Sequence, residues 1–157
     1  MIKFSRVESK YGEFSNFKSC RIAYNGLVYG SSEAAWQAQK CPERAEEFTR
    51  LSPSSAKKLG RQVKLRPDWE EIKYEEMINV LRAKFNQYPS LQRLLLSTGN
   101  EELVEDTTGW HDNIWGNCEC ARCSKFPGKN LLGKALMHVR AELRNDPYVL
   151  AGSTHLF

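Results

Sequence analysis

Apolar residues recur at helical spacing in the last third of the chain. Leu132, Leu136, Val139 and Leu143 are separated by four, three and four positions, which places them on one face of a helix. Asn130 precedes them and belongs to a residue type that caps helix N-termini. The pattern predicts a helix that begins near Asn130 and buries this apolar stripe.

Other helices are predicted upstream from caps, proline positions and apolar spacing. Their ranges are 33–40, 43–51, 53–59, 69–86 and 89–97. Ser31-Ser32 precedes the first of these helices, and Ser52 precedes Pro53 at the start of the third. Gly99 closes the last one.

The longest predicted helix, 69–86, has both a start signal and a buried face. Asp68 and Glu71 have the spacing of a capping box. The apolar stripe of this helix consists of Ile72, Met77, Val80, Leu81 and Phe85. Trp69, in its first turn, is an ordinary packing residue on this pattern alone.

Strand signals are fewer. Residues 21–24 and 27–29 flank Asn25-Gly26, which is a strong signal for a tight hairpin turn. The pattern at residues 101–105 predicts a weak strand. No repeat, linker or low-complexity segment divides the chain. The sequence therefore predicts one α+β domain over residues 1–157, rich in helix, with a small β-hairpin.

Composition and charge narrow the class of protein. With 41% hydrophobic residues the chain can bury a core, and it has no apolar run long enough for a membrane span or a signal peptide. A cytoplasmic protein is the expectation. The net charge of +4 is compatible with phosphorylated partners but is a weak indication.

The segment 111–130 concentrates unusual chemistry. Gly128, Lys129 and Asn130 stand at a predicted helix start, where free backbone N–H groups and an ammonium favour an anion. Asp112 and Trp115 precede them and offer a carboxylate and an aromatic face. This combination predicts a nucleotide-like ligand.

A second candidate site lies on the first predicted helix. Glu33, Gln37 and Lys40 fall on one face, because their spacings are four and three. The ordinary interpretation of such a row is a solvated face, which the pattern alone favours. Among the cations of residues 57–66, Arg61 beside Gly60 is the one singled out for phosphate binding.

Cysteines are crowded in one place. Cys118, Cys120 and Cys123 lie within six residues of the five-cysteine chain, and a structural zinc ion needs four ligands. The fourth ligand is His111, Cys41, Cys20 or His155 in this hypothesis. The alternative is three thiols without metal on an exposed loop.

Several of these residues, in their order and spacing, resemble the NADAR domain (YbiA-like) family over nearly the whole chain. The matching positions are Ser15-Asn16-Phe17, Glu33, Gln37, Lys40, Gly60-Arg61, Asp68-Trp69-Glu70, Met77, Lys84-Phe85, Thr98-Gly99, Asp112, Trp115-Gly116, Gly128 to Gly133, Met137 and Arg140. The sequence departs from the family at Trp36, where a smaller ring is common. It departs again at 117–127, where the cysteines replace a short glycine turn.

The resemblance implies an N-glycosidase that separates a phosphorylated ribose or ADP-ribose from a base-like leaving group. The substrate implied is a ribosyl-pyrimidine phosphate of riboflavin synthesis or an ADP-ribosylated guanine of nucleic acid. Such a reaction passes through an oxocarbenium-like transition state and needs a nearby carboxylate. No cofactor is expected in the chemistry itself.

Roles follow from the resemblance. The candidate catalytic residues are Glu33, Asp112 and Trp69, and the candidate substrate-binding residues are Asn16, Gln37, Lys40, Arg61, Trp115, Gly116, Gly128, Lys129 and Asn130. Glu33 is expected to stay anionic beside the helix dipole. The base is either Glu33 or Asp112, and Trp69 and Trp115 are candidates for stacking on the base.

Two other classes of protein fit part of this pattern. A module that binds ADP-ribose without cleaving it would use the same phosphate-binding and stacking residues, although it would not need both carboxylates. A zinc-stabilised nucleic-acid module would use the cysteines and the basic stretch, and its affinity would fall steeply with salt.

Overall fold

The computed structural model describes residues 1–6 and 10–149 of the chain. The helices are α1 (Ser32–Ala38), α2 (Pro53–Gly60), α3 (Trp69–Gln87), α4 (Pro89–Ser97) and α5 (Leu131–Arg144), with 3-10 helices η1 (Gly12–Phe14), η2 (Pro42–Arg50) and η3 (Cys123–Lys125). The strands are β1 (Ile2–Phe4), β2 (Ile22–Tyr24), β3 (Leu27–Tyr29) and β4 (Leu103–Glu105). This is the predicted α+β fold, rich in helix.

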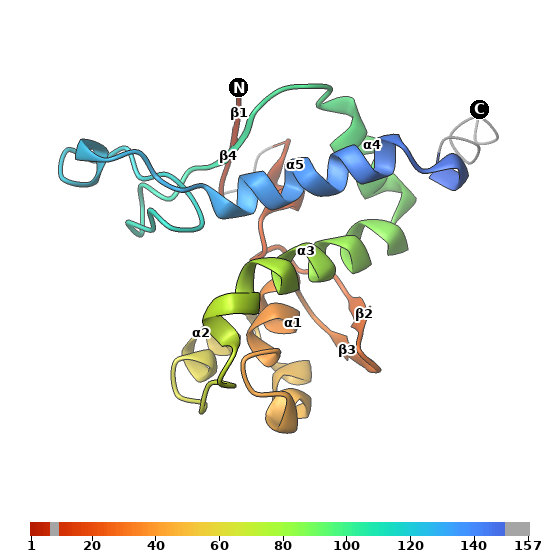
Figure 1. The fold of residues 1–157 in the computed structure, drawn as a ribbon, viewed down its shortest axis with the longest axis vertical. Coiled ribbons are helices and arrows are strands. Elements are labelled where there is room, and N and C mark those ends of the chain that lie inside the picture. The colour runs from red at the N-terminus through yellow and green to blue at the C-terminus, as the bar shows by residue number, and fades with distance from the viewer. Residues whose placement is uncertain (7–9, 150–157) are drawn as a thin grey trace.

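Helix α3 is the centre of the fold. It lies between α5 on one side and α1 on the other, and α2 packs against α1 (Figure 1). The predicted apolar stripes of α3 and α5 are buried, apart from Ile72, which is half-buried. Met77, Leu81 and Phe85 of α3 belong to the same core as Leu136 and Val139 of α5.

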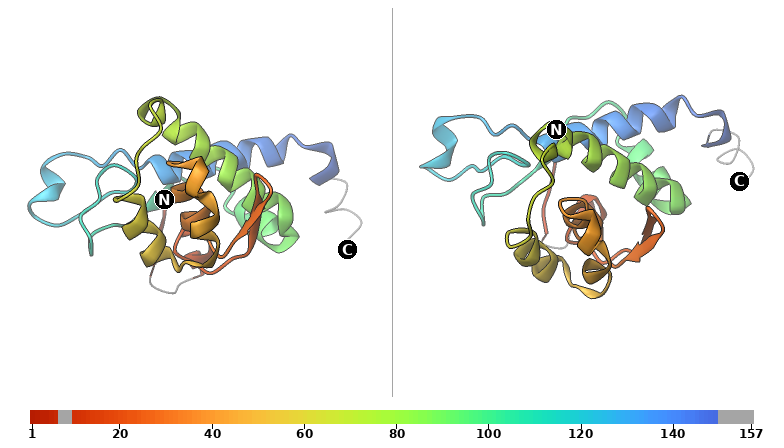
Figure 2. Two further views of the ribbon diagram at one scale, coloured as in Figure 1. Left: turned by 90° about the horizontal axis from the view of Figure 1, so that it is seen from below. Right: turned by 60° about the horizontal axis from the view of Figure 1, so that its bottom comes forward.

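The predicted hairpin is present as β2 and β3. Its turn has positive φ at both central residues, 48° at Asn25 and 83° at Gly26, as a type I′ turn requires. The hairpin packs beside α3 (Figure 2). The segment between β4 and α5 extends from the opposite side of the molecule (Figure 2).

Strand β1 was not predicted. It pairs in parallel with β4, in a register that places Ile2 opposite Leu103 and Phe4 opposite Glu105. All three residues of β4 are buried. This two-stranded sheet therefore holds the end of β4, and the segment that follows it, against the N-terminus.

Local predictions were wrong at two places. Asp68 does not cap α3 with its side chain, because both of its carboxylate oxygens accept hydrogen bonds from Arg66. Residues 42–50 form a 3-10 helix instead of the predicted α-helix. The tail from residue 150, including His155, lies outside the described residues.

Within residues 1–6 and 10–149, every helix is too short or too polar to cross a bilayer.

Candidate active site

One cavity collects most of the residues that the sequence singled out. Its lining residues are Arg6, Asn16, Phe17, Glu33, Trp36, Gln37, Lys40, Lys57, Arg61, Met77, Glu105, Trp110, Asp112 and Trp115. They come from the chain between β1 and β2, from α1, α2 and the residues just after each, from α3, from the end of β4 and from the segment between β4 and α5. The cavity therefore lies where the N-terminal helices meet the 106–130 segment.

Helix α1 contributes Glu33, Trp36 and Gln37 to the lining of the cavity. Ser31 caps it as predicted, because its Oγ accepts the N–H of Ala34 at 3.1 Å. Glu33 and Gln37 are 7% and 3% exposed, so the interpretation of this row as a solvated face is wrong. Gln37 Nε2 donates to Glu33 Oε1 at 3.0 Å, which joins the two side chains inside the cavity.

The pairing of Gln37 with Glu33 depends on a glycine of α2. A Cβ atom at Gly60 would lie 1.9 Å from Gln37 Oε1. Within the described residues that oxygen is buried and accepts no hydrogen bond. Gly60 thus leaves room for the Gln37 amide and places the next residue, Arg61, at the cavity.

The pKa of Glu33 is shifted opposite to the expectation based on the helix dipole. Burial raises its pKa, against the hydrogen bond from Gln37 and the positive charges of Lys57, Lys40 and Arg6, which lower it. Desolvation of a fully buried carboxylate exceeds the effect of one helix terminus, which is about 0.3–1 kcal/mol. The ionised form therefore depends on the cations that share the cavity.

Glu105 is an acidic residue that the sequence analysis missed. It is the last residue of β4 and is 8% exposed. Burial, followed by the charges of Asp112 and Glu33, raises the pKa of Glu105 to about 8. A glutamate that ends an apolar strand just before a candidate loop is the signal that could have identified it.

Asp112 has one oxygen in a structural role. Its Oδ1 accepts the backbone N–H groups of Ile114 at 2.8 Å and Trp115 at 2.9 Å, which is the Asx-turn that its sequence context offers. Within the described residues, Oδ2 accepts no hydrogen bond. Asp112 therefore shapes its loop and still presents a carboxylate oxygen to the cavity that it lines.

Three indoles form a continuous contact. The Trp36 ring lies 5.1 Å from Trp69 and 5.0 Å from Trp115, measured between centroids. Trp36 and Trp115 line the cavity, whereas Trp69 is buried in the core and is absent from the lining. Trp69 thus has the packing environment of an ordinary core residue.

Another aromatic pair was missed. The Arg6 guanidinium lies 3.8 Å from the centroid of Phe17 and 4.1 Å from that of Trp110. Both rings line the cavity. The sequence did not indicate this group of three residues, because Arg6 and Trp110 are far apart in sequence and only the fold brings them together.

The cavity is lined by four cations beside its three acidic residues. Arg6, Lys40, Lys57 and Arg61 line it. Burial lowers the pKa of Lys40, while the charge of Glu33 opposes this effect. The cavity therefore offers both an anion-binding surface and buried carboxyl groups.

Asn16 lines the cavity but uses its side chain internally. Its Oδ1 accepts the Ser32 hydroxyl at 2.7 Å, and its Nδ2 lies 3.5 Å from Met77 Sδ. Its backbone oxygen accepts the N–H of Glu33 at 3.1 Å. Asn16 therefore holds the start of α1 in place.

The expected free N–H groups at the start of α5 are not free. The N–H groups of Lys129, Asn130, Leu131 and Leu132 donate to backbone oxygens of residues 113–116, at distances of 2.8–3.2 Å. Gly128 N–H donates to Asn117 Oδ1. The prediction of an open anion site here was wrong, because the preceding loop already satisfies these donors.

Asn130 and Gly116 also have structural surroundings. The Asn130 side chain does not cap α5 but bonds the backbone of β4, through Glu105 N–H and Leu103 O. A Cβ atom at Gly116 would lie 2.7 Å from Glu105 O. Gly116, Gly128, Lys129 and Asn130 are outside the cavity lining and fasten the loop to β4 and α5.

The cysteine cluster lies outside the cavity lining. The ligand atoms of His111, Cys118, Cys120 and Cys123 all lie within 4.8 Å of one another. Among the four candidates for the fourth position, the structure brings His111 to the cysteines. Cys41 is buried in the main core, and Cys20 packs against that core. These four side chains form a group that could hold a metal ion.

The chain is similar in sequence and in structure to known proteins. The NADAR domain model matches residues 3–144, and the chain belongs to the NADAR family, as the sequence pattern predicted. The N-glycosidase YbiA of Escherichia coli is 38% identical over 148 residues, which are 91% of this chain and 88% of that protein. Its NMR structure matches with a TM-score of 0.78 at 39% identity, covering 91% of this chain and 84% of that one.

A second relative has a more specific name. A riboflavin biosynthesis protein of Vibrio vulnificus is 35% identical over 155 residues, which are 95% of this chain but 40% of that protein. Together these relatives support a glycosidase role for the chain.

Proposed function

We propose that the chain hydrolyses the N-glycosidic bond between a phosphorylated ribose or ADP-ribose and a base-like leaving group. The observation that carries this proposal is a single cavity lined by three carboxyl groups, four cations and several aromatic rings. Carboxylates stabilise positive charge at the sugar, cations bind phosphate, and flat rings contact a base.

Glu33 is the residue that stabilises the transition state. Cleavage of the bond leaves positive charge on the ribose C1 atom, and a carboxylate in a desolvated site attracts that charge more strongly than one in water. Lys40, Lys57 and Arg6 favour the ionised form of Glu33, and Gln37 fixes one of its oxygens.

Glu105 supplies the proton. Its pKa of about 8 keeps it protonated at neutral pH, while the cations around Glu33 oppose the rise that burial causes in the pKa of that residue. Paired carboxyl groups whose environments separate their pKa values divide the roles of acid and base. The leaving nitrogen takes the Glu105 proton as the bond to C1 breaks.

Asp112 orients the attacking water. Water adds its oxygen to C1 and gives up one proton, which Asp112 accepts through Oδ2, the oxygen not used in its turn. The products are a ribose with a hydroxyl at C1 and the free base, whose leaving nitrogen now carries the Glu105 proton. Proton exchange with solvent then restores Asp112 and Glu105.

Arg61 and Lys40 bind the phosphate of the substrate, with Lys57 and Arg6 close by in the same lining. Trp115, or the Phe17 and Trp110 pair, provides the aromatic face for the base. The free metabolite is a ribosyl-pyrimidine phosphate, in line with the name of the Vibrio relative. The polymeric alternative is ADP-ribosylated guanine in nucleic acid.

A module that only binds ADP-ribose is the competing function. An anionic ligand does not call for three carboxyl groups in its own cavity, two of them with pKa values raised by burial. The cost of burying them is explained if they act on a cationic transition state.

A substrate panel tests the proposal. Purified protein is incubated with ribosyl-pyrimidine phosphates, the matching nucleosides, NAD, ADP-ribose and ADP-ribosylated DNA, and release of free base is followed by chromatography. We expect base release from a phosphorylated or ADP-ribosylated compound and little from the bare nucleoside. Tight binding of ADP-ribose without base release from any member would favour the binding module instead.

A further inference from the structure

The four side chains His111, Cys118, Cys120 and Cys123 have the spacing of a metal site. His111 Nδ1 lies 3.5 Å from Cys118 Sγ, 3.4 Å from Cys120 Sγ and 3.7 Å from Cys123 Sγ. A tetrahedral zinc ion with Zn–S of about 2.3 Å and Zn–N of about 2.0–2.1 Å separates nitrogen from sulfur by about 3.5 Å. The three nitrogen–sulfur distances therefore match those around a tetrahedral zinc ion, and all four ligand atoms lie within 4.8 Å of one another.

The cluster has the outer contacts that metal-bound thiolates require. Cys123 N–H donates to Cys120 Sγ at 3.4 Å, a bond that favours a negatively charged sulfur. His111 has φ of 60°, an uncommon conformation for a residue other than glycine. That backbone turn directs the imidazole toward the cysteines.

The segment that carries the cysteines has no hydrophobic core of its own. No residue from Glu119 to Lys129 is buried, and Phe126 is 76% exposed. The segment extends from the body of the molecule beyond the start of α5 (Figure 1). A small unit without apolar burial is ordered by a metal or another cross-link.

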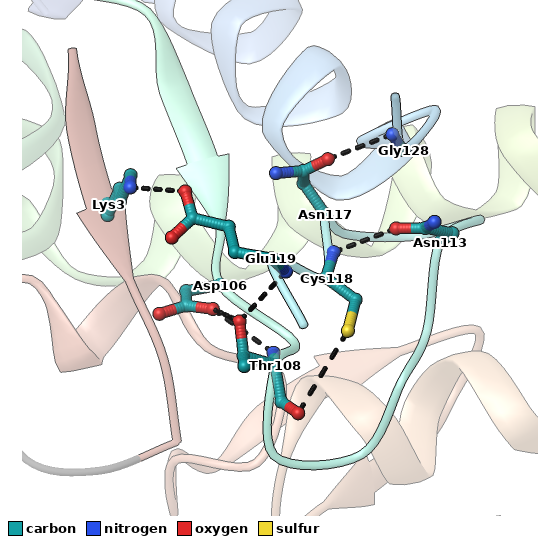
Figure 3. Close-up of polar contacts among 8 residues, drawn as sticks. All are labelled: Lys3, Asp106, Thr108, Asn113, Asn117, Cys118, Glu119 and Gly128. Atoms are coloured by element: carbon teal, nitrogen blue, oxygen red, sulfur yellow. Dashed lines mark hydrogen bonds and ion pairs between the residues drawn. The ribbon is translucent and has the colours of Figure 1, made fainter. Parts of the chain in front are cut away.

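Polar contacts connect this segment to the rest of the chain (Figure 3). Cys118 N–H donates to Asn113 Oδ1 at 2.7 Å, and Glu119 N–H donates to Thr108 Oγ1 at 3.0 Å. Glu119 also pairs with Lys3 of β1. The base of the segment is thus tied to the residues that follow β4.

The cluster and the cavity share one short stretch of backbone. His111 reaches the cysteines, whereas its neighbours Trp110 and Asp112 line the cavity. Asn113 joins the two as well, because its Nδ2 donates to Cys123 O at 3.1 Å. A bond to His111 would therefore fix the peptides that position Trp110 and Asp112.

We propose that His111, Cys118, Cys120 and Cys123 bind one zinc ion that braces the catalytic loop. Zinc binding releases the thiol protons, so that three thiolates and one neutral imidazole complete a tetrahedral shell. The ion takes no part in the chemistry, because none of its ligands lines the cavity. The link to catalysis rests on the proposed function, whereas the metal site does not.

Metal content of the purified full chain tests the site. Protein prepared under reducing conditions with zinc chloride, then freed of excess metal by gel filtration, is expected to contain about one zinc per chain. Cys120→Ser should lose most of this zinc, and Cys20→Ser, which removes a thiol outside the cluster, should retain it. A folded wild-type protein without zinc would overturn the proposal.

Cobalt substitution keeps the test decisive where Cys120→Ser does not fold. Cobalt(II) bound by three thiolates and one imidazole gives the strong visible bands of a tetrahedral site and sulfur-to-metal charge transfer. Their appearance at one equivalent supports the site, and a weak octahedral spectrum contradicts it.

Chelation tests the structural role of zinc separately from the proposed catalytic function. Removing zinc should lower the melting temperature by several degrees and reduce kcat/KM, by up to about 10²-fold if Asp112 shifts by about 1 Å. Adding zinc back should restore both. Loss of zinc with unchanged turnover would overturn the brace, and a zinc-containing protein that cleaves no substrate would overturn the proposed function instead.

Discussion

At the scale of single residues, the unusual feature is a pair of buried glutamates in one cavity. Burial raises the pKa values of both glutamates, but Gln37 and nearby cations oppose the rise at Glu33, whereas the charges of Asp112 and Glu33 add to it at Glu105. The same cavity therefore holds a proton donor, Glu105, and a second buried glutamate whose ionised form is favoured by neighbouring cations. This difference between the two glutamates is the basis for a prediction on the pH dependence of the reaction.

The pH dependence of the reaction follows from the two glutamates. Activity should rise on the acidic side as Glu33 ionises and fall near pH 8 as Glu105 loses its proton. Glu105→Gln should lower kcat by about 10²-fold or more and remove the alkaline limb, which steady-state rates across pH would reveal. An alkaline limb that persists unchanged in Glu105→Gln would assign it to another group.

Arg61 should act only on phosphorylated substrates. Arg61→Ala is expected to weaken binding by about 1.5–3 kcal/mol, the usual contribution of a hydrogen bond to a charged group, which is roughly 10- to 150-fold in Kd. Titration calorimetry with the phosphorylated compound and its nucleoside measures the difference. Equal losses for both ligands would show that Arg61 is a structural residue of the turn after α2.

At the scale of elements, helices α1 and α2 approach so closely that only a glycine fits between them. Gly60→Ala places a Cβ atom 1.9 Å from Gln37 Oε1, which would push the amide away from Glu33. We expect kcat/KM to fall by about 10- to 100-fold, the equivalent of one hydrogen bond to a charged group.

Gly30→Ala is the matched control for this substitution, because nothing lies within 4 Å of its added Cβ atom. It should leave kcat/KM near the wild-type value. The packing argument fails if the two alanine variants have the same activity.

The elements that the sequence predicted well are those with local causes. Ser31 and Ser52 cap α1 and α2 through their own side chains, and Asn25-Gly26 sets its turn by backbone preference alone. Asp68 and Asn130 have the same residue types at helix starts, yet their side chains bond Arg66 and β4. At Asp68 a neighbouring cation replaced the cap, whereas at Asn130 the replacing partners are 25 and 27 residues away and lie outside any local sequence window.

The candidate site was likewise predicted only where the signal is local in the sequence. Glu33, Gln37, Lys40, Arg61, Asp112 and Trp115 were predicted and share one cavity. Glu105 was missed because its pKa results from burial by segments distant in sequence, and because the β1 strand beside it pairs across about one hundred residues. His111 could not be selected from four candidate ligands without the fold.

At the scale of the whole molecule, the buried Glu105 carboxyl has a stability consequence. Its pKa is about 8 in the folded state and near 4.5 when unfolded. The unfolded chain therefore binds fewer protons between these values, so the free energy of unfolding falls as pH rises from about 4.5 to about 8.

Glu105→Gln removes this pH-dependent fall in the free energy of unfolding while keeping the shape of the side chain. The melting temperature of the variant minus that of the wild type should therefore become more positive from about pH 5 to about pH 8. Calorimetry of both proteins across this range provides the measurement. A difference that is independent of pH would mean that Glu105 titrates normally in the fold.

The whole molecule brings the N-terminal helices against the end of β4 and the 106–130 segment, and the cavity exists only because these parts meet. In this cavity, the central proposal is that Glu33 stabilises the transition state rather than the bound substrate. An interaction of that kind affects kcat and leaves affinity largely intact.

The most direct measurement compares kcat with ligand affinity in Glu33→Gln, using the substrate that the panel identifies. The variant should fold as the wild type does, bind the substrate within a few-fold of the wild-type Kd and release almost no base. A variant that retains the wild-type rate of base release would contradict the assignment of this cavity as an N-glycosidase active site centred on Glu33.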